Sequence, residues 1–390
     1  MLRPVFRKSA ARSPLALVPI LVLVTGLFLG GCSDQPGDVG KGLLTAQDTL
    51  HLETRLSYAT SAVAFLTRIN GNSGRVLVGT YQDLEASTLV EFAGIPRSDS
   101  AVTIDSATIR LGVEYRFRDS TGEFGLVAHN MLRTWGTASF RWDSLAGAYD
   151  NAIAGTYLKT IEPSDTSVTF RVDTALIRRW SRSGTGSLVL MPSLTAQLVL
   201  GFSNTLSTAS GKRPFLKIYR RGSADTTVVD SLRASRSIFV ANSTFPPAQP
   251  YAFVQAGVDY PALLRFDSLA LPPKVSVIRA SLVFAIDEGA SFLNSYSRDS
   301  LIAYLTRKDV YPYDSLILGV VCSPERVGGQ KFYRADVKNI VQQWISREPN
   351  HGFAVHSYAE ATTLDRFALY GANAPTGLRP KLTVDYTLFP

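Results

Sequence analysis

The sequence contains few cysteine, methionine and histidine residues, 2, 3 and 4 respectively among 390 residues. Chemistry that depends on thiols or on histidines is therefore not expected. It has a single long apolar run, which lies wholly before Cys32, so a protein with several membrane spans is excluded. Charged residues make up 18% of the chain and hydrophobic residues 45%, a balance too apolar for a disordered chain. The chain is therefore predicted to be globular, and at most one segment can meet a bilayer.

Sequence motifs of common enzymes are missing as well. There is no G-x-S-x-G elbow, no phosphate-binding glycine loop and no C-x-x-C pair, which excludes nucleotide and thiol chemistry. No carboxylate pair stands out among the 32 acidic residues, as glycoside hydrolysis would need. The histidines at 51, 129, 351 and 356 are dispersed, and surface or turn positions are expected for them. We predict that the chain is not an enzyme. The alternative, an enzyme whose active-site cleft has no recognisable motif, would require acidic side chains that converge and have perturbed pKa values.

The N-terminal segment has the layout of an export signal. A basic, acid-free stretch from Arg3 to Arg12 precedes an uncharged run from Leu15 to Gly31. The run Leu29-Gly30-Gly31-Cys32 resembles the lipobox of bacterial lipoproteins, in which cleavage occurs before the cysteine and its sulfur carries a diacylglyceryl group. We predict a signal peptide over residues 1–31 and lipidation at Cys32. The alternative is an uncleaved membrane helix of about 17 residues, interrupted by Pro19.

Lipidation would set the location and the charge of the mature chain. By the same resemblance, Asp after the cysteine favours inner-membrane retention; Ser33 stands there, so outer-membrane placement is expected in a Gram-negative envelope.

Residues 32–48 contain Gly and Pro without periodicity and are predicted to form a flexible tether. Removal of residues 1–31 takes away four basic residues and no acid, so the net charge falls from +8 to +4, too little for nucleic-acid binding. Cys322 would then be the one free thiol, in a predicted buried strand, and no intrachain disulfide is expected.

The rest of the chain repeats itself at a long period. The matching positions are Phe65 with Phe239 and Leu89 with Leu263 at an offset of 174, Ala107 with Ala280 at 173, Trp180 with Trp344 at 164, and Arg213 with Arg379 at 166. A shared order over this length predicts duplicated domains rather than a short-period solenoid. The junction is expected between Gly222 and Ser235.

Apolar residues alternate with polar ones in many segments, which predicts strands. From Ala107 to Tyr115 every second residue is apolar, so this strand is expected to have one buried face and one solvent-exposed face. The same period recurs in 167–172, 215–219, 278–286, 352–356 and 381–386. One short helix per copy is also predicted, because apolar residues at helical spacing lead up to Trp180 and Trp344.

The mature length exceeds what one core usually supports, and half of it, about 170 residues, suits a sandwich of two antiparallel sheets. We therefore predict an all-β fold with two tandem antiparallel β-sandwich domains, jelly-roll-like, each with one short helix. The expected limits are residues 49–222 for the first domain, 223–235 for a linker and 236–390 for the second domain.

The motifs of copy one follow a recognisable order. They are an Ala-x-Ile-x-Leu strand, Trp135-Gly-Thr-Ala-Ser-Phe-Arg-Trp142, an Asp-Thr helix ending in Trp180, a Gly-Ser-Leu-Val-Leu strand and Arg213-Pro-x-Leu-x-Ile218. This order resembles the DNRLRE domain family, disaggregatase-related surface modules of bacteria and archaea. The resemblance implies a tandem β-sandwich that is similar to carbohydrate-binding modules. Copy two departs from it, because the two-tryptophan segment is missing there, and Asp336 lies eight residues before its tryptophan whereas Asp173 lies seven before its own.

Trp135, Trp142 and Tyr149 are the candidate ligand-binding residues. Flat aromatic faces stack on the C–H faces of sugar rings, so these three side chains could form a platform for a polysaccharide. Tryptophans seven residues apart in an all-β domain more often plug the end of a sheet, and this second interpretation is favoured.

Aspartates at turns are the other candidate ligands. Asp99, Asp105 and Asp143 could supply oxygen atoms to a structural calcium ion, the one cofactor considered, although their spacing is not that of an EF-hand. The sequence does not identify a metal. The role of Asp in forming turns is a simpler explanation for the presence of these three residues.

These features predict a lipid-anchored cell-envelope protein with non-catalytic binding domains and a polysaccharide ligand. The alternative is a structural or adhesive lipoprotein that holds a surface protein. An exposed apolar patch or sheet edge, rather than an aromatic groove, would distinguish the alternative.

Overall fold

The computed structural model describes most of the chain after residue 51. The described residues are 52–64, 70–71, 74–97, 103–207, 210–221, 226–244, 250–295, 297–308 and 318–388. They all belong to one compact unit, Leu52–Pro390. The predicted signal peptide, the lipobox with Cys32 and the tether lie outside them, as do Phe65 and Asp99. No described helix is long and apolar enough to cross a membrane.

The described chain is all-β, as predicted, with two antiparallel sheets that each enclose a core. The first sheet forms what we call the first sandwich. Its strand order is β3 (Asn70–Gly71), β13 (Thr227–Ser243), β12 (Phe215–Arg221), β6 (Thr103–Phe117), β11 (Val199–Ser203), β4 (Arg75–Tyr81), β5 (Leu84–Ala93), β10 (Thr185–Pro192), β7 (Gly122–Met131) and β8 (Tyr149–Ile161), with β9 (Ser167–Arg171) paired to β6. The long strand β13, second in this order, also pairs with β5, which is seventh.

The second sheet forms the second sandwich. Its strand order is β1 (Leu52–Tyr58), β22 (Lys381–Leu388), β16 (Val275–Phe292), β19 (Gln330–Asp336), β18 (Gly319–Val327), β17 (Leu301–Leu305), β20 (Phe353–Ser357), β15 (Ala262–Arg265) and β2 (Ser61–Ala64). Two further strands, β14 (Tyr251–Gln255) and β21 (Arg366–Tyr370), pair with each other, and β21 also pairs with β16.

The pattern of strand β6 shows how sequence periodicity becomes structure. Ala107, Ile109 and Leu111 are each at most 1% exposed, whereas Arg110 between them is exposed. Because successive side chains of a strand point to opposite faces, burial of one face fixes the pairing register of the strand. The other predicted strands are likewise found, including β18, in which Cys322 is buried and unpaired.

Each sandwich has one α-helix, α2 (Thr174–Ser183) in the first and α3 (Lys338–Ser346) in the second. The carboxylate of Asp173 accepts a hydrogen bond from the Ala175 amide at 2.9 Å, and Asp336 accepts one from the Lys338 amide at 3.0 Å. Asp173 is thus the N-cap residue of α2, whereas Asp336 lies one residue before Val337, the N-cap of α3, and binds the amide of the first helical residue. The two positions correspond, and the extra residue of copy two lies between its aspartate and the first helical residue.

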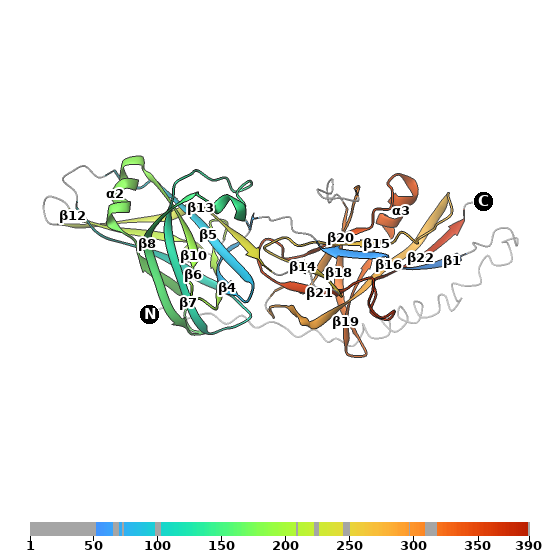
Figure 1. Ribbon diagram of the computed structural model, residues 1–390. Coiled ribbons are helices and arrows are strands. Elements are labelled where there is room, and N and C mark those ends of the chain that lie inside the picture. The colour runs from blue at the N-terminus through green and yellow to red at the C-terminus, as the bar shows by residue number, and fades with distance from the viewer. Residues whose placement is uncertain are drawn as a thin grey trace, which may run out of the picture. The chain divides into compact units, whose positions relative to one another are not determined.

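The first strands of the two repeats are exchanged. Strand β1 pairs with β22 from Leu52 opposite Thr387 to Tyr58 opposite Lys381, and β2 pairs with β15, so both belong to the second sandwich. Figure 1 shows β1, drawn in blue, beside the orange and red strands β16 and β22. Strand β13 occupies the corresponding place in the first sandwich, where it pairs with β12 and β5. Each sandwich thus takes its first strand from the other repeat.

This exchange changes the expected division of the chain. From Thr227 onward the predicted linker 223–235 forms part of the continuous strand β13. Residues up to 243 complete the first sheet, while β1 and β2, which were assigned to the first domain, complete the second. Periodicity could not show this, because it identifies a strand and its buried face but not the strand's partner. Whether each sandwich folds by itself stays a prediction.

The two sandwiches share buried contacts within this compact unit. Val258 and Leu364 of the second sandwich belong to the apolar core of the first. The guanidinium of Arg366 on β21 donates to both carboxylate oxygens of Asp83 before β5, at 3.1 and 2.6 Å, and to the Ser243 hydroxyl at 3.1 Å. The Arg366 side chain is only 2% exposed, so a buried ion pair joins the two sheets.

Candidate functional site

The predicted aromatic segment lies between β7 and β8, where it covers one face of the first sandwich. Trp135 is 3% exposed and belongs to a small apolar cluster with Met131 and Phe140. Its indole nitrogen donates to the Ser187 hydroxyl at 2.7 Å, and the Arg236 guanidinium lies 4.4 Å from the ring centre. The Trp135 ring is therefore enclosed, which is the arrangement expected of a residue that plugs a sheet.

Trp142 and Tyr149 pack against the same cluster and are half-buried. Tyr149 lies 5.2 Å from the His129 ring, with the two ring planes tilted by 47°. With Trp135 enclosed, the three aromatic residues do not present one open, flat platform for a sugar. Any carbohydrate would have to be held by other side chains of this region.

A cavity of about 330 Å³ lies beside this segment, between helix α2 and strands β7 and β10. Trp180 lines it and donates from its indole nitrogen to the Asn130 side-chain oxygen at 3.0 Å. Arg133 and Arg179 also line it, and neither forms an ion pair with a described residue. Glu91, the one acidic residue of the lining, is paired with Arg236 at 2.6 Å. The cavity therefore has an excess of positive charge.

The predicted calcium ligands are not brought together among the described residues. Asp105 forms an ion pair of 3.3 Å with Arg221, and Asp143 lies in the first turn of the short 3-10 helix Trp142–Leu145. Asp99 lies outside the described residues. Within the described part of the chain, the side chains that could share a metal ion are a different set, Asp259, His356 and Glu360.

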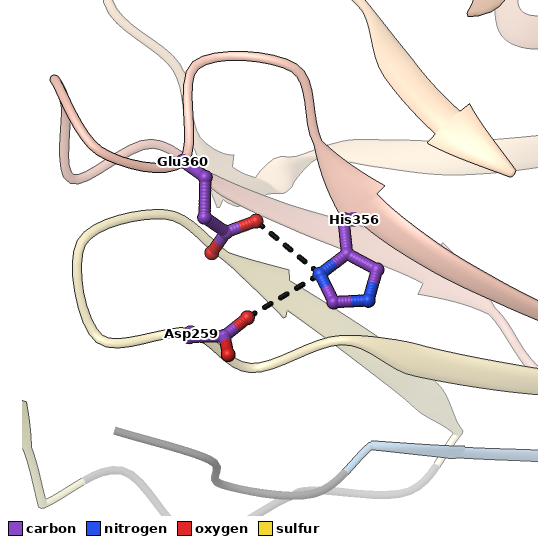
Figure 2. A group of neighbouring side chains, drawn as sticks. All are labelled: Asp259, His356 and Glu360. Atoms are coloured by element: carbon purple, nitrogen blue, oxygen red, sulfur yellow. Dashed lines mark ion pairs between the residues drawn. The ribbon is translucent and has the colours of Figure 1, made fainter. Parts of the chain in front are cut away.

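This set, the Asp-His-Glu cluster, lies in the second sandwich (Figure 2). His356 is on strand β20, Glu360 is in the loop that follows it, and Asp259 is in the turn between β14 and β15. Nδ1 of His356 lies 3.3 Å from Oδ1 of Asp259 and 3.5 Å from Oε2 of Glu360. The ring also contacts Tyr304 edge to face, at 5.5 Å between ring centres. Two carboxylates therefore face one imidazole nitrogen.

The cluster is largely withdrawn from water. The side chains of Asp259, His356 and Glu360 are 9%, 12% and 21% exposed. Both oxygens of Glu360 and Nε2 of His356 are buried without a regular hydrogen bond to a described residue. Burial at this depth leaves no room for a polymer between the carboxylates, so the cluster does not have the open form of a glycosidase site.

Burial and mutual charge perturb the ionisation of the cluster. Burial raises the pKa of Glu360, and the nearby His356 opposes the rise. Burial lowers the pKa of His356, but the two carboxylates beside its ring, Asp259 and Glu360, outweigh it, so the net direction is upward. These are the converging acids that the enzyme alternative requires, but they surround a buried imidazole instead of an open cleft.

The cluster was missed in the sequence, and a surface position is wrong for His356. Asp259 lies 97 residues before His356, and no spacing rule connects a turn aspartate with a strand histidine over that distance. The pair His356 and Glu360, four residues apart at the end of a predicted strand, was the available signal.

The comparisons with known proteins place this chain in no family. No protein-family model matches it, and no curated protein matches it. Among solved structures, a chain from "Structure of the Macrobrachium rosenbergii Nodavirus" is 9% identical to it, over 99% of this chain and 96% of that one, with a TM-score of 0.15. At that TM-score the likeness carries no argument about fold or function.

Proposed function

We propose that this chain is a lipid-anchored protein of the bacterial cell envelope, in the outer membrane, whose β-sandwiches bind a polysaccharide without catalysing a reaction. The lipobox-like run before Cys32 supports the anchor, and the resemblance of the motifs in copy one to the DNRLRE family supports a carbohydrate-binding module. The observation that carries the proposal is the cavity between α2, β7 and β10 in the first sandwich.

The chemistry of this cavity favours an acidic polysaccharide. Guanidinium groups bind carboxylates through paired hydrogen bonds, and Arg133 and Arg179 are the lining residues that offer such groups. The side chains of Asn130, Thr134 and Ser187 provide partners for sugar hydroxyls. Leu176 and Trp180 of helix α2 supply apolar surface beside these polar groups.

A glycan array tests this proposal. The full-length chain in detergent should bind polysaccharides that contain uronic acids better than neutral ones, and binding should weaken with salt. The double variant Arg133→Gln, Arg179→Gln should lose at least about tenfold in affinity, since each lost charged hydrogen bond costs about 1.5–3 kcal/mol. Arg178→Gln is the matched control, because Arg178 is exposed on the same helix but does not line the cavity. Absence of glycan binding, or equal binding by all variants, would reject the proposal.

A specific observation favours a second candidate function, adhesion to a protein partner. Strand β8 ends the strand order of the first sheet, and its Ile153 and Leu158 are 60% and 62% exposed. An edge strand with apolar side chains can pair with a strand of another chain. Crosslinking on the cell surface would identify such a partner, and the variant Ile153→Lys, Leu158→Lys should abolish the crosslink while leaving glycan binding unchanged.

A further inference from the structure

We propose that Asp259, His356 and Glu360 bind one divalent transition-metal cation of the zinc class, and that this cation joins two loops of the second sandwich. The inference is independent of the proposed glycan site, which lies in the first sandwich. It starts from the convergence of the three side chains on one point, which Figure 2 shows.

The backbone holds the ligands in place without help from a metal. Gln255 and Tyr260 exchange both backbone hydrogen bonds, at 2.9 and 3.0 Å, so the turn that carries Asp259 is tightly closed. Asp259 itself has a φ of 61°, a left-handed conformation that most side chains avoid and that Asp and Asn tolerate. The amide of Gly257 in this turn donates to the Glu360 carbonyl oxygen at 2.8 Å, which fixes the two loops to each other. Two of the three ligands are therefore preorganised across a loop–loop contact.

The distances fit a shared cation better than a direct ion pair. Hydrogen bonds between charged groups are usually about 2.7–2.9 Å long. The separations from His356 Nδ1 to the two carboxylate oxygens are 3.3 and 3.5 Å. Zinc bonds of about 2.0–2.1 Å in a tetrahedron place neighbouring ligand atoms about 3.3–3.4 Å apart. The two separations from Nδ1 match neighbouring corners of a zinc tetrahedron, and all three ligand atoms lie within 4.8 Å of one another.

The charge of the cluster points the same way. If both carboxylates are ionised, one imidazolium compensates one of them and leaves one negative charge in a largely buried site, which is costly. Among the described residues, Glu360 has no cationic partner other than His356. A divalent cation with a neutral imidazole balances both carboxylates.

The donor atoms select the class of metal. Imidazole nitrogen together with carboxylate oxygen suits zinc and its neighbours, whereas calcium and magnesium take oxygen ligands almost exclusively. The calcium ion considered from the turn aspartates is therefore not the ion that this cluster would hold.

Calorimetric titration of the metal-stripped, full-length chain in detergent is the direct test. Zn²⁺ should bind with a stoichiometry of one per chain and raise the midpoint of thermal unfolding by several degrees, because it binds the folded state alone. Co²⁺ should give the intense visible absorption of a tetrahedral site, and Ca²⁺ should displace neither metal. Absence of Zn²⁺ binding by the wild-type chain would overturn the proposal without any variant.

Three conservative variants assign the ligands. Asp259→Asn, which keeps a side chain tolerant of positive φ, His356→Gln and Glu360→Gln should each weaken Zn²⁺ binding at least about tenfold. His351→Gln, five residues from His356, is the matched control and should bind Zn²⁺ like the wild type. Each variant is first melted in EDTA; Glu360→Gln should unfold at the same temperature as the wild type or higher, since it removes a buried carboxylate. A triple variant that combines the three substitutions should not bind Zn²⁺ at this site. Undiminished Zn²⁺ binding by the triple variant would place the metal elsewhere and reject the assignment.

Discussion

The two sandwiches arise from one repeated unit but bury charge differently. In the first, every described Asp, Glu, Lys and Arg side chain keeps some contact with water, and the core is apolar. In the second, Asp259, Lys331, Asp365 and Arg366 are buried. Packing of apolar shapes defines the first sandwich, whereas paired charges contribute to the second. The second should therefore respond to pH, ions and charge substitutions to which the first is indifferent.

The largest expected effect comes from removing the exchanged strand. A chain of residues 65–244 contains the strands of the first sandwich, including β13, and should unfold cooperatively. A chain of residues 65–222, which ends at the boundary predicted from the sequence, lacks β13 and should show no cooperative transition, because β12 and β5 each lose the partner strand that they share. Thermal unfolding followed by circular dichroism distinguishes the two chains. If both unfold with the same cooperative transition, the domain boundary predicted from the sequence is correct after all.

Loss of the buried Arg366 should be the most damaging single substitution of a charged residue. Arg366→Ala leaves Asp83 and Gln255 without the guanidinium that they contact, and removal of one partner of a buried pair typically costs about 3–5 kcal/mol. Urea unfolding monitored by tryptophan fluorescence gives this free energy. Arg334→Ala is the control: its guanidinium is half exposed and pairs with Glu325, so its loss should cost about 1 kcal/mol or less. Similar costs for both would mean that the burial of Arg366 does not make its ion pair more important to stability than an exposed pair.

A pH dependence should come from the second sandwich. Burial raises the pKa of Asp365 to about 6, although Ser297, the Asn294 amide and Thr363 stabilise its charged form. The folded state therefore holds this proton more firmly than the unfolded state, and the stability it contributes below about pH 4 is lost as the pH rises through 6. The loss should amount to roughly 2–3 kcal/mol, at 1.36 kcal/mol for each unit of pKa shift. Unfolding curves between pH 4.5 and 7.5 measure it, and Asp365→Asn should flatten the profile; an equal slope in that variant contradicts the assignment.

The smallest effect separates the two helix tryptophans. Trp180 donates to Asn130, whereas the buried Nε1 of Trp344 has no hydrogen-bond partner among the described residues. Trp180→Phe should therefore cost about 1 kcal/mol more than Trp344→Phe, because only the former leaves an amide oxygen unsatisfied. Chemical unfolding of the two variants gives the difference. A larger cost for Trp344→Phe would show that its indole has a partner beyond the described residues.

The parts of the fold that depend on local patterns were predictable from the sequence. Alternation over Ala107–Tyr115 identified β6 and its buried face, and the apolar spacing before Trp180 and Trp344 identified both helices. The long-period repeat predicted two similar halves, and two sheets with the same exchange are found. Local pattern and global fold agree in these elements, as they do in sequences with little frustration.

The parts that depend on distant partners were not predictable. Nothing in residues 52–64 indicates that they pair with strands more than 190 residues away. The Asp-His-Glu cluster needs a turn and a strand end from different parts of the chain, and its aspartate stands in a common turn sequence. The enclosed position of Trp135 depends on Ser187 and Arg236, which become its neighbours only when β10 and β13 join the sheet.

The exchange of first strands also sets an order of assembly during synthesis. A ribosome releases β1 first and β22 last, and these two strands are partners, with Leu52 opposite Thr387. The first sandwich can close once residue 243 has emerged, whereas β2 stays unpaired until β15 is synthesised and β1 until β22 is synthesised. A premature stop codon anywhere before residue 381 removes the partner of β1. The sheet of the second sandwich is therefore completed only after β22 has been synthesised, and shorter chains leave β1 unpaired and accessible to proteases.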